Sequence, residues 1–126
     1  MKKLLLVIAL FISMMMSSQS FIKHYDHVIK KDRVNNELSQ WEPTNLIAIF
    51  SGNNKGDVVL YFGTGTVERY TKTGVIKQGI SKDGFKYRYI HTFDENRIPT
   101  ILQLFDSGVF RVHTQDETYE YQQPTN

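Results

Sequence analysis

The sequence predicts an all-β protein, a single-domain antiparallel meander that forms either a small barrel or a two-layer sandwich of about eight strands. From position 46 onward, turn signals built from Gly, Asn, Asp and Ser recur at the 8–12-residue spacing of sandwiches and barrels. The runs between them are rich in Val, Ile, Thr, Tyr and Phe, the residues enriched in strands. Connections this short join antiparallel neighbours, because a parallel crossover needs a dozen or more residues.

Eight strands are expected in this part of the chain. Gly and Asn in the turns supply the positive φ that tight hairpins require, and Asp side chains bond back to their own backbone. Two of the strands, Leu46–Phe50 and Val58–Phe62, are apolar on both sides, so we expect them to be covered on both faces. The expected strands are Leu46–Phe50, Asp57–Phe62, Thr66–Thr71, Val75–Ile80, Phe85–Phe93, Thr100–Phe105, Val109–Thr114 and Thr118–Gln122.

The stretch 21–45 is compatible with two structures. Phe21–Lys30 has the composition of a strand, which would form a hairpin. Val34, Leu38 and Trp41, at i, i+4 and i+7, instead fit one face of a short helix. Pro43 would end either element, because it pushes the residue before it toward extended geometry.

The first twenty residues have the layout of a secretory signal peptide. Lys2 and Lys3 precede an apolar stretch of about ten residues, and small residues follow, with the expected cut after Ser18 or Ser20. A spanning helix needs roughly 20 apolar residues, so we expect no transmembrane anchor after cleavage. The sequence therefore predicts export to the periplasm or the extracellular medium. The chain would consist of a leader (1–20), an antiparallel β domain (21–122) and a frayed tail (123–126).

The composition of the exported part excludes several function classes. Lys2 and Lys3 are the only charges in the leader, which leaves 13 basic and 13 acidic side chains and a net charge of zero. A nucleic-acid-binding domain would be expected to keep a basic excess. The chain has no Cys, which excludes disulfides, thiolate zinc sites and cysteine nucleophiles.

No motif for catalysis, metal or cofactor binding stands out, so neither an enzyme nor a cofactor is predicted. His24 and His27 would point to opposite faces of a strand, which argues against a metal site that uses both as ligands. The segment Gly63–Thr66 faintly resembles a phosphate loop, but strand-forming residues follow it where such a loop needs a helix. A hairpin turn is the better interpretation.

Charged side chains in the middle of strands are expected to form cross-strand ion pairs on the solvated face. These residues are Glu68, Arg69, Lys86, Arg88, Arg111 and Glu120.

The aromatic residues give the one candidate binding site. Alternation along Phe85–Phe93 puts Phe85, Tyr87, Tyr89, His91 and Phe93 on one face, which we expect to be covered, against Lys86, Arg88, Ile90 and Thr92. Tyr119 and Tyr121 share one face of their strand, opposite Thr118, Glu120 and Gln122. Phe110 and Val112 likewise oppose Arg111 and His113. Tyr offers both a ring and a hydroxyl, which suits sugars, small molecules and protein interfaces. The predicted ligand-binding residues are Tyr87, Tyr89, His91, Tyr119 and Tyr121.

Three turn-rich segments carry a family resemblance: Asn54-Lys55-Gly56-Asp57, Ser81-Lys82-Asp83-Gly84-x-Lys86-Tyr87 and Leu102-Gln103-Leu104-Phe105-Asp106-Ser107-Gly108. Together they resemble a pattern in small exported bacterial β-meander proteins of unknown function, over about residues 46–122. The resemblance implies a compact meander and assigns no activity. Strand number and length are also similar to those of lipocalin-like barrels, although the usual Gly-x-Trp lead-in strand is absent.

The sequence thus favours an exported, non-catalytic binding module for a small apolar or sugar-like molecule. The alternative is a protein–protein interaction module, such as an inhibitor or an envelope assembly factor, whose partner is another exported protein. An aromatic cavity would support the first hypothesis, and an exposed apolar patch beside an unpaired edge strand would support the second.

Overall fold

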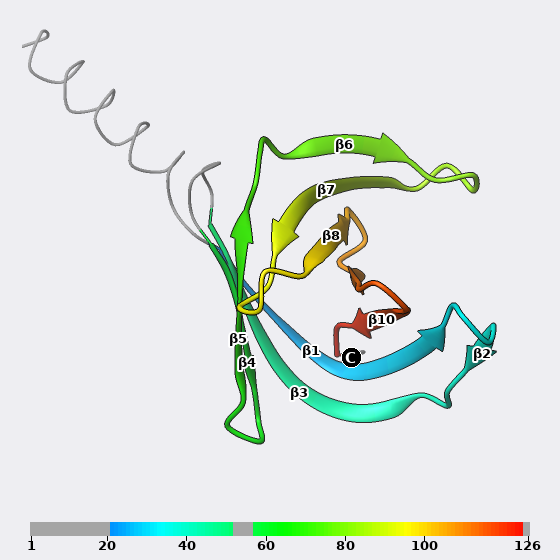
Figure 1. Ribbon diagram of the computed structural model, residues 1–126. Helices are drawn as coiled ribbons and strands as arrows, with labels where there is room; N and C mark the ends of the chain where they lie inside the picture. Colours follow the sequence, from blue (N-terminus) through cyan, green and yellow to red (C-terminus); the bar gives the residue numbers. More distant parts are fainter. Residues whose placement is uncertain (1–20, 52–56, 125–126) are drawn as a thin grey trace, which may run out of the picture.

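The computed structural model describes residues 21–51 and 57–124, and every regular element in these ranges is a β-strand (Figure 1). No apolar helix of membrane-spanning length occurs among the described residues. The predicted leader and the turn at 53–56 lie outside the described residues. The strands are β1 (Phe21–Asp32), β2 (Glu37–Leu38), β3 (Glu42–Phe50), β4 (Val58–Phe62), β5 (Val67–Lys72), β6 (Lys77–Ile80), β7 (Lys86–Phe93), β8 (Pro99–Phe105), β9 (Phe110–His113) and β10 (Glu117–Gln122).

Eight strands close into an antiparallel barrel in the order β1-β3-β4-β5-β7-β8-β9-β10, and β10 returns to β1. The closing pair β1–β10 runs from His27↔Gln122 to Asp32↔Glu117. The β5–β7 seam is short, with the pairs Thr71↔Phe93 and Lys72↔Thr92. The all-β meander is confirmed, and of the two predicted architectures the barrel is the one that forms.

β2 and β6 lie outside the ring and extend two of its hairpins. β2 pairs with the end of β1 beyond the reach of β3, and β6 pairs with the start of β7 beyond the reach of β5. In Figure 1, β2 and the β6–β7 turn both lie at the right of the view, whereas β4 and β5 lie at the left.

The hairpin interpretation of residues 21–45 is confirmed, and the helix does not form. Asp32 accepts hydrogen bonds from the backbone N–H groups of Val34 and Asn35, which fixes the turn after β1. Pro43 does not end an element; it lies within β3, opposite the point where β1 has a bulge, a position where a strand tolerates proline. The Gly63–Thr66 segment is a turn that leads directly into β5, as the hairpin interpretation requires.

Side chains fill the barrel interior. Tyr25, Leu46 and Phe110 are fully buried, and the Tyr25 and Phe110 rings stack with their centroids 5.7 Å apart. Phe50 meets Phe110 edge-on at 5.2 Å. An eight-stranded barrel is just wide enough for side chains to fill, so this aromatic cluster separates the two ends of the interior.

The predicted orientation of β7 is wrong. Ile90 and Thr92 face the core, and the Thr92 hydroxyl donates to the Thr100 carbonyl at 2.7 Å. His91 is exposed, and Phe85 and Phe93 keep 58% and 42% of their surface exposed. The first half of β7 pairs with β6 beyond the closed barrel. In that part of the strand, alternation does not separate core-facing from solvent-facing side chains, and the face with more aromatic residues lies outside.

The predicted two-sided cover of β3 and β4 is also wrong, because a barrel wall has one inner face. Ile47 and Tyr61 point outward and are 42% and 41% exposed. The face that alternation gives to Phe110 and Val112 on β9, and to Tyr121 on β10, is the inner one, and all three residues are buried.

Candidate functional site

The inner face of β5 carries a charge toward each end of the barrel. Glu68, Tyr70 and Lys72 alternate along the strand and therefore point to the same side. Tyr70 is buried, which identifies that side as the interior. Glu68 lines a cleft at one end, the acidic end, and Lys72 lines a pocket at the other, the basic end.

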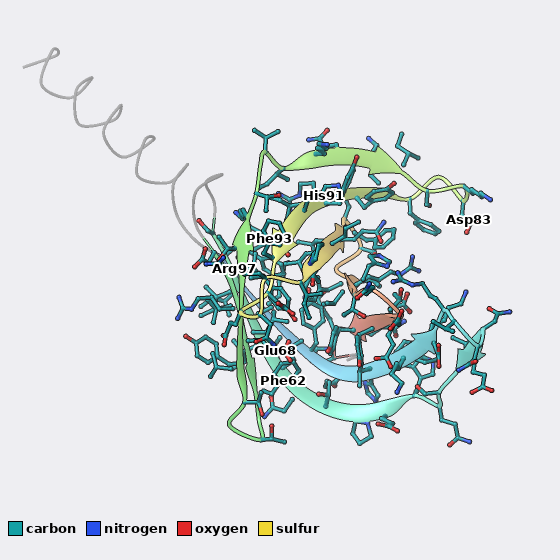
Figure 2. The ribbon with its side chains drawn as sticks, viewed as in Figure 1. Phe62, Glu68, Asp83, His91, Phe93 and Arg97 are labelled. Atoms are coloured by element: carbon teal, nitrogen blue, oxygen red, sulfur yellow. The ribbon has the colours of Figure 1, made fainter. Side chains whose placement is uncertain are left out.

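The acidic end is a cleft of about 450 Å³. Strands β4, β5, β9 and β10 contribute its wall, and the β7–β8 turn contributes its rim. Phe62 and Glu68, labelled in Figure 2, belong to the wall. The lining residues used below are Phe62, Glu68, Tyr70, Tyr119 and Tyr121 from the wall and Asp94, Glu95 and Asn96 from the rim.

Hydroxyl groups and carboxylates interact closely at this end. The Tyr70 hydroxyl donates to Glu68 Oε2 at 2.6 Å, and the Tyr119 hydroxyl donates to Glu117 Oε2. Burial raises the pKa of Tyr119 to about 12, with further contributions from Glu117 and from the negative charge of Glu68. Burial also raises the pKa of Tyr70 and Tyr121, and Glu68 adds to both shifts. The cleft is therefore a site of negative potential lined by neutral phenols.

The charge balance of the cleft is acidic. Asp94 Oδ1 accepts hydrogen bonds from the backbone of its own turn, and Glu95 Oε1 accepts one from the backbone N–H of Arg69 at 3.2 Å. Among the described residues that line the cleft, Arg69 is the one cation, and its guanidinium lies 3.9 Å from the Asp57 carboxylate. Within the described residues, no Lys, Arg or His forms an ion pair with Glu68.

The basic end is smaller and mostly apolar, with a volume of about 80 Å³. The Phe21 and Phe50 rings stack there at 5.1 Å, and the Arg88 guanidinium lies 5.7 Å from the Phe21 ring centroid. Lys72 Nζ donates to the Ser51 carbonyl at 3.0 Å, and burial lowers the pKa of Lys72. The protein's own groups thus occupy this end.

The five predicted binding residues do not lie in one place. Tyr119 and Tyr121 line the acidic end, whereas Tyr87, Tyr89 and His91 form a row of rings along β7, with centroids 5.9 and 6.1 Å apart. Tyr89 reaches the rim of the basic end, and His91 lines a separate depression on the outer surface.

Tyr87 has a packing role that the sequence did not reveal. Its ring covers Gly79, its cross-strand partner on β6, so closely that a Cβ added to the glycine would lie 2.6 Å from ring atoms. The ring holds the β6–β7 hairpin together, and any larger residue at position 79 would displace it.

Glu68 is the functional candidate that the sequence interpretation missed. Its predicted role, an ion pair on the solvated face, is wrong, because Glu68 lies on the inner face with Tyr70. The alternation of Glu68 with a core tyrosine was the signal that could have identified it. Of the other mid-strand charges, Arg111 and Glu120 form the expected cross-strand pair at 2.7 Å.

The histidines of β1 make local contacts. His24 Nε2 lies 3.1 Å from Asn45 Oδ1, and His27 Nδ1 lies 2.5 Å from Asp26 Oδ1. In the part of the chain that the structure describes, no group of three or more His, Asp and Glu side chains is arranged to hold a metal ion.

Comparisons of the chain with protein-family models, with curated proteins and with solved structures found no match in any of the three. The resemblance to exported bacterial meander proteins therefore stays a prediction.

Proposed function

We propose that this chain is an exported, non-catalytic binding module that takes a small molecule at the acidic end of its barrel. The observation that carries the proposal is that side chains fill the barrel interior, whereas the acidic end opens onto a large cleft. A carboxylate and three tyrosines converge on a cleft of about 450 Å³, within the range of roughly 300–1,000 Å³ typical of small-molecule sites.

The chemistry of this end supports recognition of a polar ligand with some apolar surface. Tyr70, Tyr119 and Tyr121 offer rings for packing, and Glu68 offers carboxylate oxygens that fix orientation. A few polar groups set in an aromatic wall are typical of ligand sites. The purely apolar ligand expected from sequence has less support, because the apolar pocket at the basic end is about 80 Å³, and an engineered cavity that binds benzene is about 150 Å³.

A ligand screen with a blocked cleft tests the binding function. We would screen soluble amines, sugars and short carboxylic acids by ligand-observed NMR against the wild type and Asn96→Trp. Asn96 is an exposed rim residue, so a bulky ring there should obstruct the cleft without disturbing the core.

The matched control is Asp83→Trp, which places the same ring at the tip of the β6–β7 hairpin (Figure 2). We expect hits that Asn96→Trp abolishes and Asp83→Trp retains. Hits that neither variant affects would place binding elsewhere on the protein and overturn this site.

Export is a separate part of the proposal, based on the leader-like residues 1–20. Mass spectrometry of the protein recovered from outside the cytoplasm should give an N-terminus at Gln19 or Phe21. Recovery of the intact chain, beginning at Met1, from the cytoplasm would contradict export.

A protein partner is the second candidate, favoured by the edge of β6. In the described part of the chain, β6 pairs with β7 alone. Val75, Ile80 and Phe85 beside it are 61%, 66% and 58% exposed. Exposed edges of this kind accept strands from other chains. A partner captured from the exported fraction by the wild type, lost with Ile80→Lys and retained with Asp83→Lys, would favour this function.

A further inference from the structure

The acidic end carries negative charge that no described residue neutralises through an ion pair. Glu68 is half-buried beside buried Tyr70, and no cation forms an ion pair with it in the described residues. Asp94 and Glu95 add two further carboxylates at the rim. Withdrawing a charge from water is unfavourable unless an opposite charge or hydrogen bonds compensate for it. A positively charged ligand would supply that compensation.

Glu68 also keeps capacity to accept hydrogen bonds. Its Oε2 atom accepts from the Tyr70 hydroxyl at 2.6 Å. A carboxylate offers about four lone-pair positions on its two oxygens. The remaining positions suit the N–H groups of an ammonium ion, and such charge-assisted bonds are the stronger kind.

The wall around Glu68 is aromatic. Phe62, Tyr70, Tyr119 and Tyr121 all line the same cleft. The faces of aromatic rings attract cations, and cages of such rings recognise quaternary and methylated ammonium groups. Burial, together with nearby carboxylates, raises the pKa of Tyr119 to about 12, so at neutral pH this tyrosine offers its ring and hydroxyl without adding charge.

Other ligand classes fit these features less well. A neutral sugar would use the hydroxyls but leave the charge of Glu68 without compensation. An anion in the cleft would be repelled by three carboxylates. Arg69 would attract it, but the Arg69 guanidinium already lies near Asp57. Building on the binding function proposed above, we propose that the acidic end binds a small organic ammonium ion, with Glu68 as its counter-ion and the tyrosine rings as its wall.

Isothermal titration calorimetry with charge-matched pairs tests the proposal on the unmodified protein. Choline is compared with its neutral carbon isostere 3,3-dimethylbutan-1-ol, n-butylamine with butan-1-ol, and methyl glucoside serves as the sugar. At least one ammonium compound should bind about tenfold or more tightly than its neutral counterpart, a ratio of the size expected when a charge pair is lost.

Two isosteric variants then test whether the charge of Glu68 causes the preference for the ammonium compound. Glu68→Gln should weaken binding of the ammonium compound by about tenfold. Glu37→Gln removes the same charge from an exposed residue of β2 and should leave the affinity unchanged. Circular dichroism verifies that both variants fold, and the paired-ligand comparison on the wild type stands even if one does not.

The outcomes separate this proposal from the binding function on which it rests. Neutral isosteres or the sugar binding as tightly as the ammonium compounds would overturn the cation class and leave the binding function standing. An equal loss with both glutamine variants would overturn the role of Glu68. No binding by any probe up to about 50 mM, well beyond a millimolar Kd, would overturn the cation proposal, and the broader screen with Asn96→Trp would then decide the binding function.

Discussion

At one end of β5 the inward-facing charge is Glu68, and toward the other end it is Lys72. Lys72 donates to the Ser51 carbonyl, and its neighbour Arg88 lies over the Phe21 ring, in a pocket of about 80 Å³. Glu68 shares a hydrogen bond with Tyr70 and opens onto about 450 Å³. One alternating strand thus supplies a charge used for packing at the basic end and a charge available to a ligand at the acidic end.

The aromatic cluster between the two ends should give the largest effect. Phe110 is fully buried and contacts the rings of Tyr25, Phe50 and Tyr121. Phe110→Ala should lower the free energy of unfolding by about 3–5 kcal/mol, the range for large aromatic truncations in a core. The control Phe93→Ala, on the outer face, should cost less than about 1 kcal/mol. Urea denaturation measures both, and equal costs would show that the interior is not filled as described.

A smaller effect of opposite sign is expected at Tyr25. Its hydroxyl is buried and has no hydrogen-bond partner among the described residues, and burial strongly raises its pKa. Tyr25→Phe removes this unsatisfied group and keeps the ring, so we expect a gain of about 1 kcal/mol in the free energy of unfolding. A loss of similar size in urea denaturation would show that the hydroxyl has a partner, such as a bound water.

Alkaline titration of the tyrosines tests whether the charge at each end of the barrel affects the pKa of the phenols at the acidic end. The folded-state pKa of the buried tyrosines lies above the ordinary value of about 10, so their contribution to stability is fully present below that pH. It is lost as the pH rises through the folded-state pKa, about 12 for Tyr119. Glu68→Gln removes one negative neighbour, and tyrosinate absorbance should then appear at lower pH.

The basic end supplies the control for that titration. Lys72→Met changes a charge on the same strand, but Lys72 is not among the groups that raise the pKa of the acidic-end tyrosines. This variant should leave the tyrosine titration unchanged. A shift as large as that of Glu68→Gln would mean that the two ends are electrostatically coupled across the core.

Tyr89→Ala should have a smaller effect than Phe110→Ala. Tyr89 is half-buried at the rim of the basic end and contacts its neighbours Tyr87 and His91. The sequence predicted that Tyr89 lies on the covered face. Truncation of a tyrosine in the core would cost about 3–5 kcal/mol. From its outward position we expect about 1–2 kcal/mol in urea denaturation, and a cost above 3 kcal/mol would restore the covered-face interpretation.

Most of the fold was predictable because local chemistry determines it. The turns at Gly65, Gly84 and Gly108 have the positive φ that their residues predict, and the strands between them follow from composition. Closure was not predictable, because it depends on β10 pairing with β1, about 90 residues away in the chain. No local pattern distinguishes a meander that closes from one that packs as two layers.

The candidate site was predicted only in part, for a physical reason. Alternation placed Tyr119 and Tyr121 on one face, and in the structure both belong to or pack against the core. Tyr87, Tyr89 and His91 alternate equally well, but β7 extends beyond the ring, so its aromatic face is the outer one. Glu68 was missed because a mid-strand carboxylate is usually solvated, and its core-facing position is evident only beside Tyr70.

We propose that the acidic end binds the ligand, and that neither the basic end nor the outer face of β7 does. Titration of the protein with choline, followed by chemical-shift changes of assigned NMR signals, distinguishes these three places. We expect the largest changes at Tyr70, Tyr119 and Tyr121, with none at Phe21 or Phe50. Changes centred on Phe21 and Phe50, or on Tyr87 and His91, would overturn this site.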